Sequence, residues 1–352
     1  MAFRSAARRT AAVTDSPPLP HALTADERPT LKTIAAETGL AVATVSRALK
    51  DAPDIGEETK RRVRETAERL GYRPNRAGVR LRTGKTNVIA LVLSTEADVM
   101  NHTSQLLYSI ARTLKGTAYH LVVMPFFPDE DPMTPIRYLV ETGSADGVIL
   151  NQTRPEDPRI RYMVERGFPF ATHGRTDMGL DHAYFDYDNE AYGRVAVRRL
   201  ASRGRKRLLI VAPPRSHSYA RHMLTGFSDE AAHLGLSFEV GEGYTSDSPS
   251  GQIEEAVFQR FSAPNPPDGL VLGSTTSSMA AVAGAERAGL VLGRDFDAVG
   301  KEAIPFLGRF RKELIVLHED VGRAGHFLAK AIIAAIERRA PEQAQYLDRP
   351  AD

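Results

Sequence analysis

The chain of 352 residues contains no cysteine. This absence excludes disulfide bonds, a catalytic thiolate and a zinc site built on cysteine ligands. The sequence also lacks an apolar run of about 18 residues that could span a bilayer, and the first 28 residues lack the apolar segment of a secretory signal. We therefore expect a soluble protein of the cytoplasm.

Familiar signatures of catalytic sites are absent as well. There is no HExxH zinc motif, no serine nucleophile elbow and no paired-glycine nucleotide fingerprint. Residues 82–86 resemble the end of a P-loop, but five residues separate Gly78 from Gly84 where that motif requires four. His318, Glu319 and Asp320 suggest a metal or acid–base site, yet no second ligand is suitably spaced, and Asp320 is expected to cap a helix. The sequence thus predicts no catalytic residue, no metal site and no cofactor.

Positive charge is concentrated near the amino terminus. Residues 1–86 contain 17 Lys and Arg against 10 Asp and Glu, a net charge of +7, whereas the remaining residues carry a net charge of −5. A basic head on a mildly acidic body indicates that only the head binds a polyanion. Residues 1–28 are rich in Pro, Ala and Ser and are expected to form a disordered arm.

Residues 29–74 show the pattern of a helix-turn-helix domain. Thr30 can cap a first helix, whose apolar positions Leu31, Ile34 and Ala35 share one face, and Gly39 can end it. The same spacing recurs at residues 45, 48 and 49, which predicts a second short helix after a tight turn. This pairing is typical of DNA-binding proteins.

A third helix is predicted from about Glu57 to Leu70. Val63, Ala67 and Leu70 should face inward. Its basic residues are expected to point mostly outward, and they are Lys60, Arg61, Arg62, Arg64 and Arg69. Such a face is ordinary on an isolated helix, but beside a helix-turn-helix it is a plausible flank for phosphates.

The rest of the chain alternates short apolar runs with helical stretches. The expected strands are residues 88–93, 120–126, 146–150, 168–174, 207–212, 269–273, 296–300 and 313–319. This alternation predicts parallel sheets covered by helices on both faces, and the number of strands favours two sheets over one.

The segments TLKTIAAETGLAVATVSRAL and LGYRPNRAGVRLRTGK resemble the headpiece and hinge of the lactose-repressor (LacI/GalR) family of bacterial transcription regulators. The likeness extends through most of the remaining chain. The resemblance implies a small all-α helix-turn-helix headpiece plus an α/β core like periplasmic binding proteins, with two parallel-sheet subdomains that the chain crosses three times. The implied parts are the headpiece (29–74), the hinge (75–86) and the core (87–352), divided into one subdomain of about 87–187 plus 303–339 and another of about 188–302 plus 340–349.

In that family the second helix enters the major groove of DNA. The corresponding positions are Val42, Ala43, Thr44, Ser46 and Arg47. Val42 and Ala43 can contact only thymine methyl groups, whereas Arg47 can bind guanine through two hydrogen bonds, so Arg47 should carry most of the polar base readout. Ala41 replaces the serine that usually caps this helix, at a cost of about 1 kcal/mol.

Further DNA contacts are implied by the resemblance alone. They are Thr30, Leu31, Lys50, Thr59, Tyr72, Asn75, Arg76, Gly78 and Leu81. Residues 75–82 would form a hinge helix that pairs with its twin on DNA and inserts Leu81 into the minor groove. A basic flexible linker is an equally good interpretation, since Gly78 costs a helix about 1 kcal/mol.

Ligands of such cores bind at the carboxyl ends of strands. The candidate effector-binding residues are Asp98, His102, His173, Arg175, Arg221, His222, Ser277, Lys301 and Glu302, with Ser278 beside them. Family members often carry a sugar-binding Arg where this chain has Met223, and an aromatic residue and Asp where it has Lys301 and Glu302. These departures, and the several cationic candidates, favour a phosphorylated or otherwise anionic metabolite. The alternative is that the charged candidates are surface groups or form ion pairs with each other.

We therefore expect a sequence-specific transcription regulator, with repression favoured, that binds operator DNA as a homodimer and is controlled by a small effector. An α/β enzyme acting on a phosphorylated sugar, with an accessory DNA-binding head, is the alternative. A solute-binding protein and a DNA binder without sequence preference are further alternatives.

Overall fold

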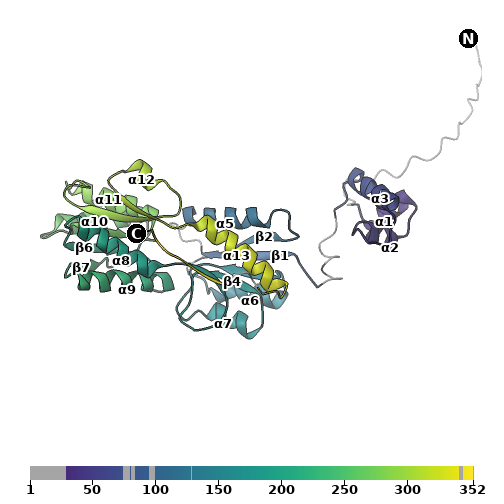
Figure 1. Ribbon diagram of the computed structural model, residues 1–352, viewed down its shortest axis with the longest axis horizontal. Coiled ribbons are helices and arrows are strands. Elements are labelled where there is room, and N and C mark those ends of the chain that lie inside the picture. The colour runs from purple at the N-terminus through teal and green to yellow at the C-terminus, as the bar shows by residue number, and fades with distance from the viewer. Residues whose placement is uncertain are drawn as a thin grey trace, which may run out of the picture. The chain divides into compact units, whose positions relative to one another are not determined.

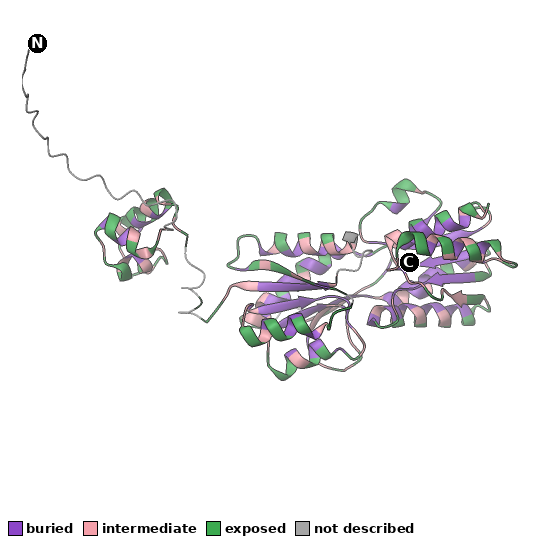
Figure 2. Ribbon diagram, turned by 180° about the vertical axis from the view of Figure 1, so that it is seen from behind, coloured by how far each residue is buried: buried purple, intermediate pink, exposed green. Residues whose placement is uncertain are grey.

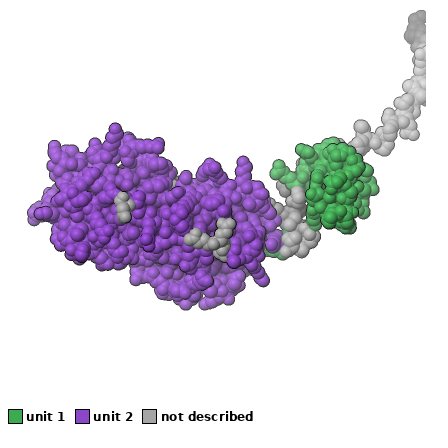
Figure 3. Space-filling model, in the orientation of Figure 1, with its two compact units in different colours: residues 1–84 green, residues 85–352 purple. Residues whose placement is uncertain are grey.

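The computed structural model describes residues 29–73, 80, 84–94, 100–127, 129–340 and 344–351. Two compact units, residues 1–84 and residues 85–352, make up the chain (Figure 3). The expected amino-terminal arm, the hinge positions Asn75, Arg76, Gly78 and Leu81, and the effector candidate Asp98 lie outside the described residues. Among the helices of the described part, none has the length and apolar character needed to cross a membrane.

The first unit contains the three predicted helices, α1 (Leu31–Thr38), α2 (Val42–Ala48) and α3 (Glu57–Arg69). Thr30 caps α1, since its hydroxyl accepts the N–H of Thr33, and Gly39 ends the helix in the left-handed conformation with φ 67°. Ile34, Val45 and Val63, one from each helix, are fully buried together. The prediction of a helix-turn-helix followed by a third helix is confirmed.

The basic face of α3 differs from the prediction. Lys60 is buried, and its ammonium contacts Glu57 at 2.7 Å and Asp51 at 3.1 Å, so the expectation that it points outward is wrong. Arg62 donates to the main-chain carbonyl of Thr38 at the end of α1. The other three basic residues form ion pairs within the headpiece, which are Arg61 with Glu58 and Glu65, Arg64 with Asp51, and Arg69 with Glu37. Most of this face therefore holds the three helices together.

The second unit contains two parallel sheets (Figure 1). The first has the order β11-β5-β4-β3-β1-β2, formed by β1 (Val88–Ser94), β2 (His120–Phe126), β3 (Gly147–Leu150), β4 (Phe170–His173), β5 (Ala183–Tyr187) and β11 (Gln345–Asp348). The second has the order β10-β9-β8-β6-β7, formed by β6 (Arg207–Val211), β7 (Ser237–Val240), β8 (Gly269–Leu272), β9 (Asp297–Glu302) and β10 (Ile315–His318). The expected fold class is confirmed.

Helices cover both faces of each sheet, and the central strands are buried between them (Figure 2). On the first sheet, α5 (Met100–Leu114) and α13 (Val321–Ile336) pack on one face, and α6 (Met133–Thr142) and α7 (Pro158–Glu165) on the other. On the second, α8 (Asn189–Ser202) and α9 (Ser218–His233) oppose α10 (Ser250–Ser262) and α11 (Thr275–Arg287), and the short α12 (Leu307–Phe310) lies near β10.

All eight expected strands are present, but three others were not predicted. They are β5, β7 and β11, of which β7 and β11 are edge strands. The strand pairing also changes the subdomain boundaries. β10 pairs with β9, so residues up to 318 belong with the second sheet, and β11 pairs with β5, so residues 345–348 belong with the first. The described chain passes between the sheets after β5 and after β10, and the implied third crossing is not seen within the described residues.

A close helix contact holds the second subdomain together. Gly226 of α9 lies against the backbone of α8, where an added Cβ would come within 1.9 Å of the Glu190 carbonyl oxygen. The contact is reciprocal, because a Cβ added at Gly193 of α8 would come within 2.5 Å of the Met223 carbonyl oxygen of α9. Because backbone atoms cannot move aside as a side-chain tip can, both positions require glycine.

Gly226→Ala should destabilise the protein by about 3 kcal/mol, because the new methyl group forces α8 and α9 apart. Urea denaturation of the full chain measures this change. Gly251→Ala in α10 is the matched control, since no atom lies within 4 Å of its added Cβ, and it should change stability by no more than about 1 kcal/mol. Equal stabilities for the two variants would contradict the packing argument.

Candidate DNA-reading helix and effector cavity

The helix α2 presents its predicted DNA-reading residues outward. Val45 and Ala48 are fully buried, whereas Val42, Ala43 and Arg47 are exposed. The amino-terminal cap at Ala41 has no side-chain hydrogen bond, as expected from its missing hydroxyl. The surface left to contact DNA therefore begins with two apolar side chains and an uncapped helix end.

The side chains of the other residues implied to contact DNA differ in their exposure to solvent. Thr30 and Lys50 are exposed, while Thr44, Ser46 and Thr59 are partly exposed. Leu31 and Tyr72 pack partly against the headpiece core, and this burial raises the pKa of the Tyr72 hydroxyl. Packing agrees with the place of Leu31 on the predicted apolar face of the first helix, whereas the sequence analysis assigned no packing role to Tyr72.

Arg47 forms an ion pair with Asp54, and about half of each side chain is exposed. Exposed ion pairs of this kind contribute only about 0–1 kcal/mol. The base contact predicted for Arg47 would therefore replace the Asp54 pair at little cost in free energy.

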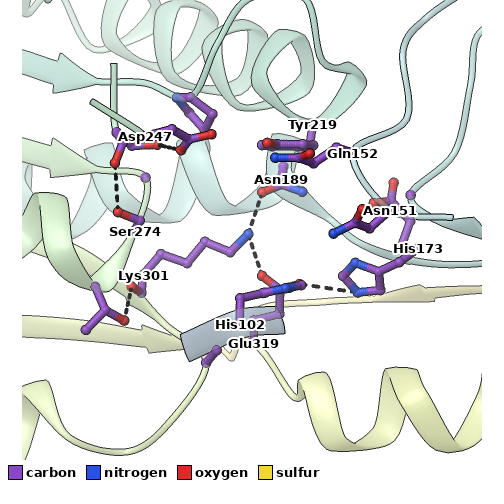
Figure 4. Close-up of a pocket in the computed structure, with 17 residues that line it drawn as sticks. His102, Asn151, Gln152, His173, Asn189, Tyr219, Asp247, Ser274, Lys301 and Glu319 are labelled. Carbon is purple, nitrogen blue, oxygen red and sulfur yellow. Dashed lines mark hydrogen bonds and ion pairs between the residues drawn. The ribbon is translucent and has the colours of Figure 1, made fainter. Parts of the chain in front are cut away.

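A polar cavity lies between the two sheets of the second unit, at the carboxyl ends of their strands (Figure 4). Of the predicted effector-binding residues, His102, His173 and Lys301 line it. His102 comes from α5, His173 ends β4 and Lys301 lies near the end of β9.

A buried carboxylate, that of Glu319, organises one wall. Lys301 Nζ lies 2.5 Å from Glu319 Oε2 and donates to Asn189 Oδ1 at 3.0 Å. Glu319 Oε1 lies 3.3 Å from His102 Nε2 and 3.6 Å from His173 Nε2. Burial acts to raise the pKa of Glu319, but Lys301 and the histidines outweigh it and hold that pKa well below its usual value. Glu319 is therefore an ionised acceptor at neutral pH.

His173 and Asp186 have shifted protonation equilibria. Burial, assisted by neighbouring His102, lowers the pKa of His173 to about 3, so its ring is neutral at physiological pH. Burial raises the pKa of Asp186 to about 7, although Arg175 opposes the shift from 3.4 Å. Arg175 does not line the cavity but sits beside this lining residue. Asp186 can consequently be either a donor or an acceptor near neutral pH.

The remaining effector candidates do not line the cavity, and each has another partner. Arg221 and His222 of α9 face Asp177 at 3.0 Å and 3.7 Å. Asp177 follows β4, so these contacts connect the two subdomains. Burial, with the charge of Arg175, lowers the pKa of His222. The prediction that Arg221 and His222 contact the effector is thus not supported by their positions.

Ser277, Ser278 and Glu302 complete local structure instead. Ser277 and Ser274 form a reciprocal cap at the start of α11, and the Ser278 hydroxyl donates to the Ser274 carbonyl at 2.7 Å. Glu302 accepts the main-chain N–H groups of Phe306 and Leu307 at 3.0 Å and 2.8 Å. Their hydrogen-bonding capacity serves helix ends and turns.

Several lining residues were missed by the sequence analysis. They include Asn151, Gln152, Asp186, Asn189, Tyr219, Asp247, Ser274 and Glu319. Asp186 lies in β5 and Asp247 follows β7, two strands that were not predicted, so the rule of inspecting strand ends could not find them. Glu319 was not predicted as a lining residue because no second ligand is suitably spaced near it in the sequence, and its partners His102 and His173 are more than 140 residues away.

Comparisons with known proteins match both units. The model "Bacterial regulatory proteins, lacI family" matches residues 30–75, and "Periplasmic binding proteins and sugar binding domain of LacI family" matches residues 86–300. The HTH-type transcriptional regulator AglR of Rhizobium meliloti (strain 1021) is 30% identical over 321 residues, which are 89% of this chain and 90% of that protein. RafR of Escherichia coli is 32% identical over 267 residues, 75% and 79% of the two chains.

Solved structures give the same result. A regulatory protein of LacI family from Chloroflexus aggregans has 26% identity and a TM-score of 0.65, covering 75% of this chain and 96% of its own. The lac repressor dimer bound to operator and the anti-inducer ONPF has 18% identity and a TM-score of 0.80, covering 92% and 97%. With its helix-turn-helix, its two parallel sheets and these matches over most of its length, the chain belongs to the LacI family of DNA-binding transcription regulators, which are not enzymes.

Proposed function

We propose that this protein is a cytoplasmic repressor that binds a near-palindromic operator as a homodimer and responds to a small ligand in the cavity between its two sheets. The observation that supports this most directly is the presence, in one chain, of an outward-facing α2 and a polar cavity at the strand ends. The lac repressor, whose fold is similar, was solved as a dimer bound to operator.

The effector is a neutral, hydroxyl-rich molecule such as a sugar. Side chains that can both donate and accept hydrogen bonds line the cavity, among them Asn151, Gln152 and Tyr219. The lining cation Lys301 is opposed by Glu319, and Asp186 and Asp247 are further acidic groups, so the wall has no excess of positive charge. An anionic effector, which the sequence favoured, depended on four cationic candidates, Arg175, Arg221, His222 and Lys301, and of these only Lys301 lines the cavity. A fold relative, the regulator CelR, was solved as a complex with cellobiose.

Ligand binding would act through contacts between the subdomains. The main-chain N–H of Ser218, at the start of α9, donates to the Thr153 carbonyl at 2.8 Å. The Asp177 pairs with Arg221 and His222 join the same two halves. A ligand that touches both walls changes the relation of these halves and so couples the cavity to DNA binding, and the coupling is reciprocal.

The homodimer would use the edge of the first sheet. Strand β2 is an edge strand, and its Val122 and Val123 are 42% and 40% exposed. Tyr108 of the neighbouring α5 and Phe127 are also exposed apolar side chains. An unpaired strand edge with exposed apolar residues favours association.

Arg47→Ala should reduce the binding free energy by which the protein prefers operator over unrelated DNA by about 1–3 kcal/mol. The reason is that the bidentate contact to guanine is lost. Fluorescence anisotropy compares an operator obtained by in vitro selection with a scrambled duplex. Arg61→Ala is the control, because Arg61 pairs only within α3. Unchanged selectivity of Arg47→Ala would remove Arg47 from base readout, and uniform footprints across genomic DNA would contradict sequence-specific regulation.

Effector affinity should rise with pH up to about 7 and then level off, because hydroxyl groups bind the ionised form of Asp186, whose pKa is about 7. The slope approaches tenfold per pH unit below that value. A thermal-shift screen of the full chain, with neutral and phosphorylated sugars side by side, selects the ligand for calorimetry. Asp186→Asn should show no such dependence. A preference for phosphorylated sugars would refute the neutral class, and pH-independent binding by the unmodified protein would refute the role of Asp186.

Val122→Asp should shift the protein from dimer to monomer, because a charge would be buried in the proposed interface. Sedimentation at several concentrations measures the change. Val164→Asp is the control, since Val164 is similarly exposed, at 39%, but lies on α7. Dimers of equal stability in both variants would place the interface elsewhere.

A further inference from the structure

Three potential metal ligands converge on one wall of the cavity. The donor atoms of His102, His173 and Glu319 all lie within 4.8 Å of one another. The carboxylate oxygen Oε1 of Glu319 lies 3.3 Å from His102 Nε2 and 3.6 Å from His173 Nε2. In a tetrahedral zinc site with bonds of about 2.0–2.1 Å, neighbouring donor atoms are separated by about 3.3 Å. The two measured separations are therefore close to those of an assembled site.

His173 provides an independent indication of a ligand. Its side chain is only 10% exposed, and its Nε2 atom is buried without a hydrogen-bond partner. Buried polar atoms almost always have a partner, so an exception needs an explanation. Figure 4 shows His173 and His102 beside Glu319. Histidine binds metal ions through its ring nitrogens, and Nε2 of His173 lies within this cluster of donor atoms.

The carboxylate is already oriented by groups outside the triad. Lys301 occupies Oε2 at 2.5 Å and is itself held by Asn189, which leaves Oε1 to face the two rings. Such outer contacts fix the geometry of metal ligands. Lys301 also neutralises Glu319, so the affinity for a cation must depend strongly on the two imidazoles. Imidazole ligands select zinc and similar transition metals over magnesium and calcium, which prefer oxygen.

We propose that His102, His173 and Glu319 form a binding site for a zinc-class divalent transition metal ion. The three residues supply two nitrogens and one oxygen, and the fourth coordination position opens into the cavity. A water molecule, or a hydroxyl group of a bound ligand, completes the tetrahedron. The metal would join α5 and β4 of the first subdomain to the crossover that follows β10.

The experiment uses the full chain, freed of metal by dialysis against a chelator. Titration with Co²⁺, followed by its visible absorption, should saturate at one ion per chain with the intense bands of a tetrahedral site, and Zn²⁺ should abolish them. His173→Ala should weaken Zn²⁺ binding by about 100-fold or more, since even outer-sphere changes cost 10- to 100-fold. Glu319→Gln, which keeps the shape of the side chain, should also lose the tetrahedral spectrum.

His318→Ala is the matched control, because His318 is exposed and adjacent to Glu319 but does not line the cavity. It should bind Zn²⁺ as the unmodified protein does. Circular dichroism of each variant confirms folding, and His102→Ala replaces any variant that does not fold. Unsaturable or octahedral Co²⁺ binding by the unmodified protein would overturn the site, as would Zn²⁺ affinity unchanged in both His173→Ala and Glu319→Gln. Neither outcome depends on DNA or on the effector.

Discussion

The ionised carboxylate of Glu319 is the constraint around which the core is arranged. Removing such a group from water costs several kcal/mol unless a counter-charge and hydrogen-bonding partners compensate. The parallel register of β9 and β10 supplies the counter-charge, because it pairs Leu317 with Lys301 and so places Glu319 two residues further along. The same carboxylate faces two histidines of the other subdomain, His102 on α5 and His173 at the end of β4. Strand pairing, charge compensation and the meeting of the two subdomains are therefore parts of one arrangement.

Local patterns in the sequence predicted those features of the fold that depend on residues close together in the chain. The cap at Thr30, the left-handed Gly39 and the alternation of strands and helices all follow from neighbours in the chain, and the structure contains them. The strands β7 and β11 were not predicted, because they are short edge strands with exposed or half-exposed residues and no apolar run marks them. β5 has an aromatic-rich sequence interrupted by Asp186. Missing β5 and β7 concealed two acidic residues of the cavity.

The partners of charged residues could not be predicted in the same way. The sequence placed His102, His173 and Lys301 at strand ends or just beyond them, and they line the cavity. The sequence also predicted Arg175 and Arg221 as effector-binding residues, but each forms an ion pair with an aspartate, Asp186 and Asp177 respectively. Lys60 appeared to belong to an outward face until the turn after α2 brought Asp51 to it. A periodic pattern predicts which face of a helix or strand a side chain lies on. Its ion-pair partner depends on the tertiary fold, which brings distant residues together.

The contacts that join the two subdomains are compatible with the ligand response that we propose. The pair of Arg221 with Asp177 is well exposed and the hydrogen bond from Ser218 to Thr153 is single, and each such contact contributes only about 1 kcal/mol. Glu319, in contrast, is buried and strongly compensated at the crossover. The contacts of Glu319 at the crossover should therefore persist when the subdomains move, while the weaker contacts between the subdomains can break and form again. Because a ligand shifts an equilibrium only by its differential affinity for two states, weak contacts leave a small ligand able to change the relation of the halves.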